Sequence, residues 1–75
     1  MHYPDTTRIK ASVYALEDPA TGRYIRTDGA RPRLKPLAQA LLVPATPAGL
    51  AYITGRAACR LAPLGIPHEL VRLEP

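Results

Sequence analysis

The sequence is poor in the residues that carry catalysis, disulfides and large aromatic cores. Its 75 residues include one cysteine, one serine and two histidines, while phenylalanine, tryptophan and asparagine are absent. A single cysteine cannot form an internal disulfide, which is typical of proteins in a reducing cytoplasm. No apolar run approaches the ~18 residues that a membrane-spanning helix needs, and the first residues lack the apolar core of a signal peptide. We therefore expect a cytoplasmic protein that does not enter a membrane.

The abundant residues bound the size of the fold and the source of the gene. Alanine, arginine, proline and glycine supply 34 of the residues, and ten basic against six acidic side chains give a net charge of +4. Arginine outnumbers lysine eight to two, and this bias toward GC-rich codons indicates a high-GC bacterium, or a phage or other mobile element living in one. The chain is long enough for a single small domain, 1–75, and its 47% hydrophobic residues make it too apolar for a typical disordered chain.

A β-hairpin is predicted in the first third of the chain. Residues 1–7 carry no regular pattern and are interpreted as a flexible entry. From Arg8 to Leu16 apolar and polar residues alternate, which is the period of a half-buried strand. Residues 17–22 contain the Asp, Pro and Gly of a tight turn, and a second strand follows from Arg23 to Thr27. In this phase the inward residues are Ile9, Ala11, Val13 and Ile25.

The next segment places cations at alternate positions and contains two prolines. Residues 30–36 carry Arg31, Arg33 and Lys35, and the two prolines among them exclude a helix or a central strand, so that a loop is predicted. Residues 37–43 are ambiguous, because the spacing of their leucines and alanines also fits a helix. Their short length between two prolines favours a strand, and we interpret them as one.

One helix and a closing strand are predicted in the second half. Thr46-Pro47 combines an N-cap hydroxyl with proline at the first helical position. Apolar residues then recur every three or four positions as far as Leu64, and the helix is expected to end near residue 62. Gly65 is the expected residue beyond the helix end, with Ile66 as its hydrophobic contact. The final stretch, 68–73, has the leucine and valine content of a short strand.

The order β-β-β-α-β predicts an α+β fold, a small and mostly antiparallel sheet with one helix packed on one face. A chain this short buries a thin core, because apolar burial hardly exceeds the entropy of ordering below roughly 70–80 residues. One face of the predicted sheet also lacks a helix to cover it. Both points favour a partner, reached either by homodimerisation or by docking onto a larger molecule.

The residues that could support catalysis are isolated from one another in the sequence. Ser12 lies in the alternating strand, without the glycines of a nucleophile elbow. Cys59 lies in the predicted helix, where it is interpreted as a small, semi-buried hydrophobe. The run from His68 to Arg72 begins like a zinc-protease motif but ends in arginine where a second histidine is required. We therefore expect no enzyme activity, no metal site and no cofactor.

One surface of the predicted hairpin combines cations with tyrosines. The first strand turns four residues outward, namely Arg8, Lys10, Ser12 and Tyr14. The second strand turns Tyr24 and Arg26 the same way, and the 30–36 loop extends this surface. The candidate binding residues are Tyr14, Tyr24, Arg26, Arg31, Arg33 and Lys35.

Three interpretations fit this surface. Tyrosine and arginine are enriched at protein–protein hot spots, and a basic patch attracts an acidic partner, so we expect a non-enzymatic adaptor, regulator or inhibitor that binds a protein. Single-stranded nucleic acid is the alternative, because aromatic side chains on a sheet stack bases while cations meet phosphates. The third interpretation is an ordinary solvated face, in which strand-preferring tyrosines and codon-favoured arginines have no partner. The modest net charge and the thin core favour the protein partner.

Overall fold

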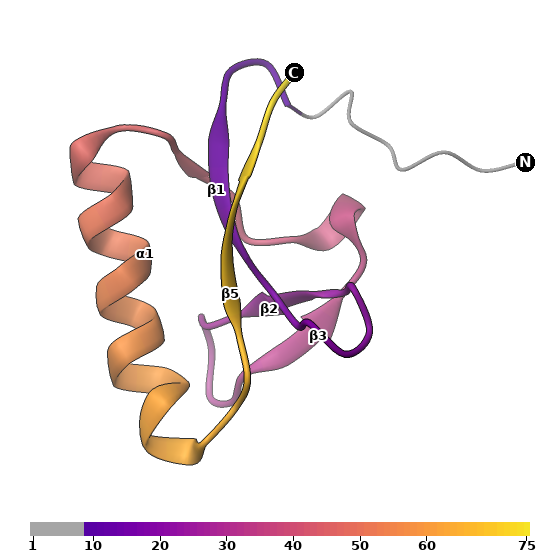
Figure 1. The fold of residues 1–75 in the computed structure, drawn as a ribbon, viewed down its shortest axis with the longest axis vertical. Helices are drawn as coiled ribbons and strands as arrows, with labels where there is room; N and C mark the ends of the chain where they lie inside the picture. Colours follow the sequence, from indigo (N-terminus) through magenta and orange to yellow (C-terminus); the bar gives the residue numbers. More distant parts are fainter. Residues whose placement is uncertain (1–8) are drawn as a thin grey trace, which may run out of the picture.

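The computed structural model describes residues 9–75, so the predicted entry segment 1–7 and Arg8, the first residue of the predicted first strand, lie outside the described residues. A five-stranded antiparallel sheet and one helix confirm the predicted α+β fold (Figure 1). The elements are β1 (Val13–Glu17), β2 (Tyr24–Arg26), β3 (Arg33–Lys35), the 3-10 turn η1 (Leu37–Gln39), β4 (Val43–Pro44), α1 (Pro47–Arg60), the 3-10 turn η2 (Ala62–Leu64) and β5 (Glu69–Leu73).

β1 has three strand partners. It pairs with β5 over its whole length, from Val13 opposite Leu73 to Glu17 opposite Glu69. Its other edge is divided, because β4 pairs with Val13 and Tyr14 whereas β2 pairs with Glu17. The β2–β3 hairpin therefore leaves the line of the β1–β5 pair and crosses it at a steep angle (Figure 1).

The turn between β1 and β2 forms as predicted. The N–H of Asp18 donates to the carbonyl of Arg23 at 2.7 Å, and the N–H of Gly22 donates to the carbonyl of Asp18 at 2.8 Å. The Asp18 carboxylate also accepts from the Thr21 hydroxyl at 2.7 Å. Gly22 has a φ of 71°, the left-handed conformation that glycine adopts without strain. β1 begins at Val13 rather than Arg8, because its partner β5 ends opposite Val13.

The predicted phase of the first strand was wrong by one residue. The core cluster contains Leu16 and Ile25, and Tyr14 packs against it, so even-numbered residues of β1 face the helix. Within Val13–Glu17 the two largest apolar side chains are Tyr14 and Leu16, and their burial outweighs that of valine and alanine. The rest of the core cluster comes from β4, α1 and the residue after it, namely Val43, Ile53, Ala57 and Leu61.

The sheet face opposite the helix is partly covered, which corrects the predicted open face. Ala15 is fully buried although it points away from the core cluster, and Ile9 and Ala40 are also buried outside that cluster. Figure 1 shows the segment that contains η1 on the side of the β1–β5 pair away from α1. The chain from β3 to β4 therefore covers this face of the sheet in place of a second helix.

The stretch from residue 30 to residue 43 differs from the prediction. The predicted loop contains the short strand β3, which pairs with β2 from Lys35 opposite Tyr24 to Arg33 opposite Arg26. A three-residue edge strand tolerates a proline at each end, because its outer backbone groups need no partner. The predicted strand 37–43 is a 3-10 turn, closed by the N–H of Gln39 on the carbonyl of Pro36, and becomes a strand only at Val43.

The helix begins on the predicted signal and ends at Arg60, and the predicted Gly65 ends the 3-10 turn η2 that follows it. The Thr46 hydroxyl accepts the N–H of Gly49 at 3.0 Å, and Pro47 takes the first helical position. After η2, Gly65 adopts a φ of 66° and Ile66 donates its N–H to the carbonyl of Leu61 at 3.1 Å, as in a Schellman motif. Ile66 packs against the core cluster, so the predicted hydrophobic contact is confirmed. No helix within residues 9–75 is long and apolar enough to cross a membrane.

The two helix glycines allow a matched test of this packing. A Cβ at residue 49 would lie 1.8 Å from the carbonyl oxygen of Pro44, whereas a Cβ at residue 55 would meet no atom within 4 Å. We expect Gly49→Ala to lower the free energy of unfolding by about 1–3 kcal/mol through overpacking. Gly55→Ala should raise it by up to about 1 kcal/mol through helix propensity. Urea denaturation measures both, and a stabilised Gly49→Ala would contradict the close approach of α1 to β4.

Candidate functional site

Arginines of the β2–β3 hairpin hold the loop between its strands. Arg26 donates through Nε and Nη2 to the two carboxylate oxygens of Asp28, at 3.0 and 2.7 Å. Its Nη1 donates to the carbonyl of Gln39 at 2.9 Å, which fixes the η1 segment to the hairpin. Arg33 donates to the carbonyls of Asp28 and Arg31, at 2.6 and 3.2 Å, and also reaches the Asp28 carboxylate at 3.3 Å. Two of the predicted binding residues, Arg26 and Arg33, are therefore engaged within the fold.

Two arginines of α1 also donate hydrogen bonds to the loop between β2 and β3. Arg56 donates to the carbonyl of Thr27 and, at 3.5 Å, to its hydroxyl, while Thr27 is fully buried. Arg60 donates to the carbonyl of Gly29 at 2.8 Å. Loop carbonyls that would otherwise face water thus receive planar donors from the helix. These contacts join α1 to the β2–β3 hairpin.

One carboxylate, that of Asp28, pairs with both hairpin arginines, Arg26 and Arg33. The Arg26 guanidinium hydrogen-bonded to Asp28 holds the pKa of that carboxyl well below its usual range, with a smaller contribution from Arg33. The same hydrogen bond raises the pKa of Arg26. A second anionic group has less to gain at this position than at an unpaired arginine, because Arg26 already has a bidentate partner.

The two predicted tyrosines lie on opposite faces of the sheet. Tyr14 packs toward the helix, whereas Tyr24 stands opposite Glu17 on the other face. Tyr24 is half-buried, and its burial, followed by the nearby charge of Glu17, raises the pKa of its phenol. Lys35 lies beside it as its cross-strand neighbour in β3. The two-tyrosine platform predicted for stacking bases is therefore not formed.

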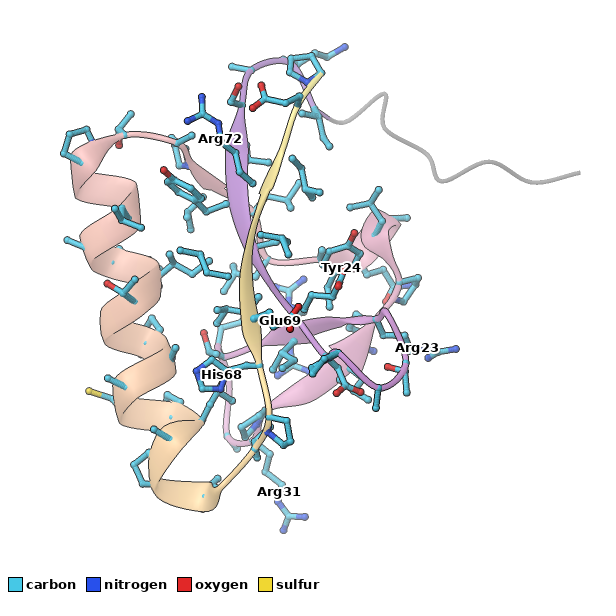
Figure 2. The ribbon with its side chains drawn as sticks, viewed as in Figure 1. Arg23, Tyr24, Arg31, His68, Glu69 and Arg72 are labelled. Atoms are coloured by element: carbon cyan, nitrogen blue, oxygen red, sulfur yellow. The ribbon has the colours of Figure 1, made fainter. Side chains whose placement is uncertain are left out.

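Arg31 is the predicted binding residue that remains most available. It is exposed, and its side chain has no hydrogen-bond or ion-pair partner within residues 9–75. Figure 2 shows it directed away from the body of the protein, near the start of β5, whereas Arg23 points outward beside the β1–β2 turn. The six predicted residues thus separate into the structural pair Arg26 and Arg33, the inward Tyr14, the cross-strand neighbours Tyr24 and Lys35, and the exposed Arg31, whose side chain has no partner within residues 9–75.

An apolar cleft lies beside Arg31. Its volume is about 280 Å³, and its lining residues are Asp18, Ile25, Pro32, Arg33, Leu34, Ile66 and Pro67. Leu34 is 43% exposed, which leaves apolar surface open at the cleft. The volume falls below the ~300–1,000 Å³ of pockets that hold drug-sized ligands, so it suits a single side chain better than a cofactor. Sequence reasoning missed the cleft because it treated 30–36 as a loop, although a leucine between two cations is the pattern of a short strand.

The residues considered for catalysis lie in different surroundings within residues 9–75. Cys59 is exposed rather than semi-buried, which corrects the prediction for it. Ser12 donates its hydroxyl to Glu74, and this hydrogen bond, followed by that from Arg72, lowers the pKa of the Glu74 carboxyl. The ring Nδ1 of His68 lies 2.8 Å from the carbonyl of Ile66. Residues 9–75 contain no group of three His, Cys, Asp or Glu side chains placed to hold a metal ion.

Comparison of the chain with family models, curated proteins and solved structures finds no match.

The Asp28 ion pairs predict a pH-dependent stability. Because the pKa of Asp28 is depressed in the folded state, the unfolded chain binds more protons, and stability must fall as the pH drops below about 4. We expect Asp28→Asn to be less stable than the parent near neutral pH, with a difference that shrinks in acid. Urea denaturation of both proteins across this range measures the difference. A constant difference would show that the carboxylate acts through shape rather than charge.

Proposed function

We propose that this chain is a non-enzymatic interaction module that binds a larger protein in the cytoplasm as an adaptor, regulator or inhibitor. The observation that supports this proposal most directly is the apolar cleft between the β2–β3 hairpin and residues 66–67. This cleft lies next to Arg31, whose side chain has no partner within the described residues. The partner segment would place one apolar side chain in the cleft and a carboxylate on Arg31.

Three aliphatic side chains give the cleft its apolar character. Ile25, Leu34 and Ile66 come from three separate parts of the chain and are held by the core and by β2–β3 pairing. A cleft built on paired strands loses little conformational entropy when a partner binds. Burial of a leucine-sized side chain there contributes about 1.5–3 kcal/mol, which supports recognition but needs further contacts for tight binding.

The arginines near the cleft differ in whether they already have a hydrogen-bond or ion-pair partner. Arg33 lines the cleft but shares Asp28, and Arg26 is fully engaged with Asp28 and Gln39. Arg31, next in sequence to the cleft residue Pro32, has no such partner within the described chain. An acidic side chain of the partner would supply the missing counter-ion, and the net charge of +4 would steer an acidic surface toward the protein.

A peptide-display selection tests this specificity directly. Purified, nuclease-treated protein is used to select from a random peptide library, and the affinity of the selected peptides is measured by fluorescence anisotropy. We expect a consensus of an apolar residue flanked by Asp or Glu. Arg31→Glu should weaken binding at least about tenfold, equivalent to about 1.4 kcal/mol, and Leu34→Ser should weaken it similarly.

Arg23→Glu is the matched control for charge. It makes the same change of two charge units at another exposed arginine, so that both variants lose the same long-range attraction. Its affinity should stay within about twofold of the parent. Equal losses at the two positions would reject the cleft as the binding site. Preferential binding of a single-stranded oligonucleotide, with affinity falling by a log–log slope of roughly 0.7 per phosphate as salt rises, would replace the protein partner by nucleic acid.

A further inference from the structure

β5 is an edge strand with one free side. Its five residues pair with β1 along their whole length, and no strand occupies the opposite side within residues 9–75. The outward N–H and C=O groups of an edge strand are a template for another strand. A second copy of β5 offers the same groups over the same length, and antiparallel pairing of identical edges gives a closed two-fold dimer rather than an open chain of copies.

Symmetry limits the registers in which two β5 edges can pair. The two-fold axis stands perpendicular to the sheet, so each face of one copy continues the same face of the second copy. Residues directly opposite each other must then point to the same face, and the sum of their two numbers is even. The registers to compare are those centred on Leu70, on Val71 and on Arg72.

The side chains that each register places opposite each other favour one of the three registers. Centring on Arg72 places the two arginines opposite each other, and centring on Leu70 places Arg72 opposite the imidazole of His68. Centring on Val71 instead places His68 opposite Glu74 of the second copy and Leu70 opposite Arg72 of the second copy. On the other face Val71 meets its own symmetry mate, and Leu73 lies opposite Glu69 of the second copy. An apolar pair such as Val71 with its symmetry mate contributes roughly 0.2–1 kcal/mol, whereas like charges directly opposite are destabilising.

A groove next to β5 fits the same register. It has a volume of about 440 Å³ and is lined by Leu16, Thr54, Ala57, Ala58, Ala62, His68 and Leu70. The small helix side chains leave Leu70 41% exposed. In the register centred on Val71, the aliphatic stem of Arg72 of the second copy lies against Leu70.

His68 also suits this arrangement. Its Nδ1 lies 2.8 Å from the carbonyl of Ile66, so Nε2 is the ring nitrogen that remains for a contact with the second copy. Figure 2 shows His68 and Arg72 on the side of β5 that faces α1, and Glu69 on the other side. The groove, the imidazole and the arginine therefore lie on one face of the extended sheet.

We propose that two copies of this chain associate through antiparallel β5 edges centred on Val71. The two sheets then form one continuous sheet, and both copies of α1 lie on the same face of it. No residue lines both the groove beside β5 and the cleft beside Arg31, so either proposal stands without the other.

Engineered cysteines test the register. In a Cys59→Ser background, which removes the exposed native thiol, Val71→Cys places two thiols opposite each other across the axis. Cα atoms of opposite residues are ~4.5–5.5 Å apart, which permits a disulfide. Glu69→Cys is the matched control on the same strand and face. Its two copies would be separated by about four residues of strand, or roughly 13 Å, and cannot form a disulfide.

Oxidation followed by non-reducing electrophoresis gives the result. We expect Val71→Cys to form the covalent dimer at least about ten times faster than Glu69→Cys. The Cys59→Ser parent should show a concentration-dependent dimer in sedimentation equilibrium, and circular dichroism should show the parent fold in each variant. A parent that stays monomeric throughout overturns the proposal. A dimeric parent with equal cross-linking at both positions also overturns it, because the interface would then lie elsewhere or in another register.

Discussion

The pairing of β1 with β5 is the constraint on which the rest of the described structure depends. It joins Val13–Glu17 to Glu69–Leu73 and so brings segments from opposite ends of the described chain into one ladder. Everything between them, including the hairpin, the η1 segment and the helix, is closed within this loop. Closing a long loop costs entropy before the contacts that repay it have formed. Docking of β5 therefore closes the loop around a core cluster whose members come from β1, β2, β4, α1 and Leu61.

Hydrogen bonds from arginine side chains join elements that large apolar side chains join in other small proteins. Phenylalanine and tryptophan are absent, and the core cluster consists of aliphatic side chains with Tyr14 beside it. The helix is tied to the β2–β3 hairpin by Arg56 and Arg60, whose guanidinium groups donate to loop carbonyls. Hydrogen bonds from charged donors contribute more than neutral ones, although partial exposure reduces the gain. Guanidinium groups used in this way have fewer N–H donors left for a partner, although their charge still contributes to the net charge of the protein.

The elements with local signals could be predicted, and those decided by distant partners could not. Thr46-Pro47 determines the start of α1, and Gly65 the end of the 3-10 turn after it, through short-range hydrogen bonds and backbone preference. The alternation from Arg8 to Leu16 indicated a strand, but its phase depended on whether Leu16 or Ala15 faced α1. The sequence alone could not weigh that choice, because it requires knowledge of what packs above the sheet.

The candidate site shows the same division. Arg31 could be identified as an exposed loop residue, whereas the engagement of Arg26 and Arg33 depends on the shape of the turn that places Asp28 between them. Asp28 follows Arg26 by two residues, and that spacing is the local signal that could have indicated a paired arginine. The prediction failed where a side chain's nearest partner came from its own hairpin rather than from solvent.

The exposed apolar residues connect the thin core to the need for association. Leu34 adjoins the cleft beside Arg31, and Leu70 adjoins the groove beside β5. A domain of this size gains little net stability from its own core, so burying either leucine against a partner adds apolar area that the isolated chain lacks. The segment from Ile66 to Leu70 lines both concavities, with Ile66 and Pro67 in the first and His68 and Leu70 in the second. Ile66 is anchored in the core, and the two surfaces are therefore presented by one short stretch whose position is fixed by the helix end before it and the β1 ladder after it.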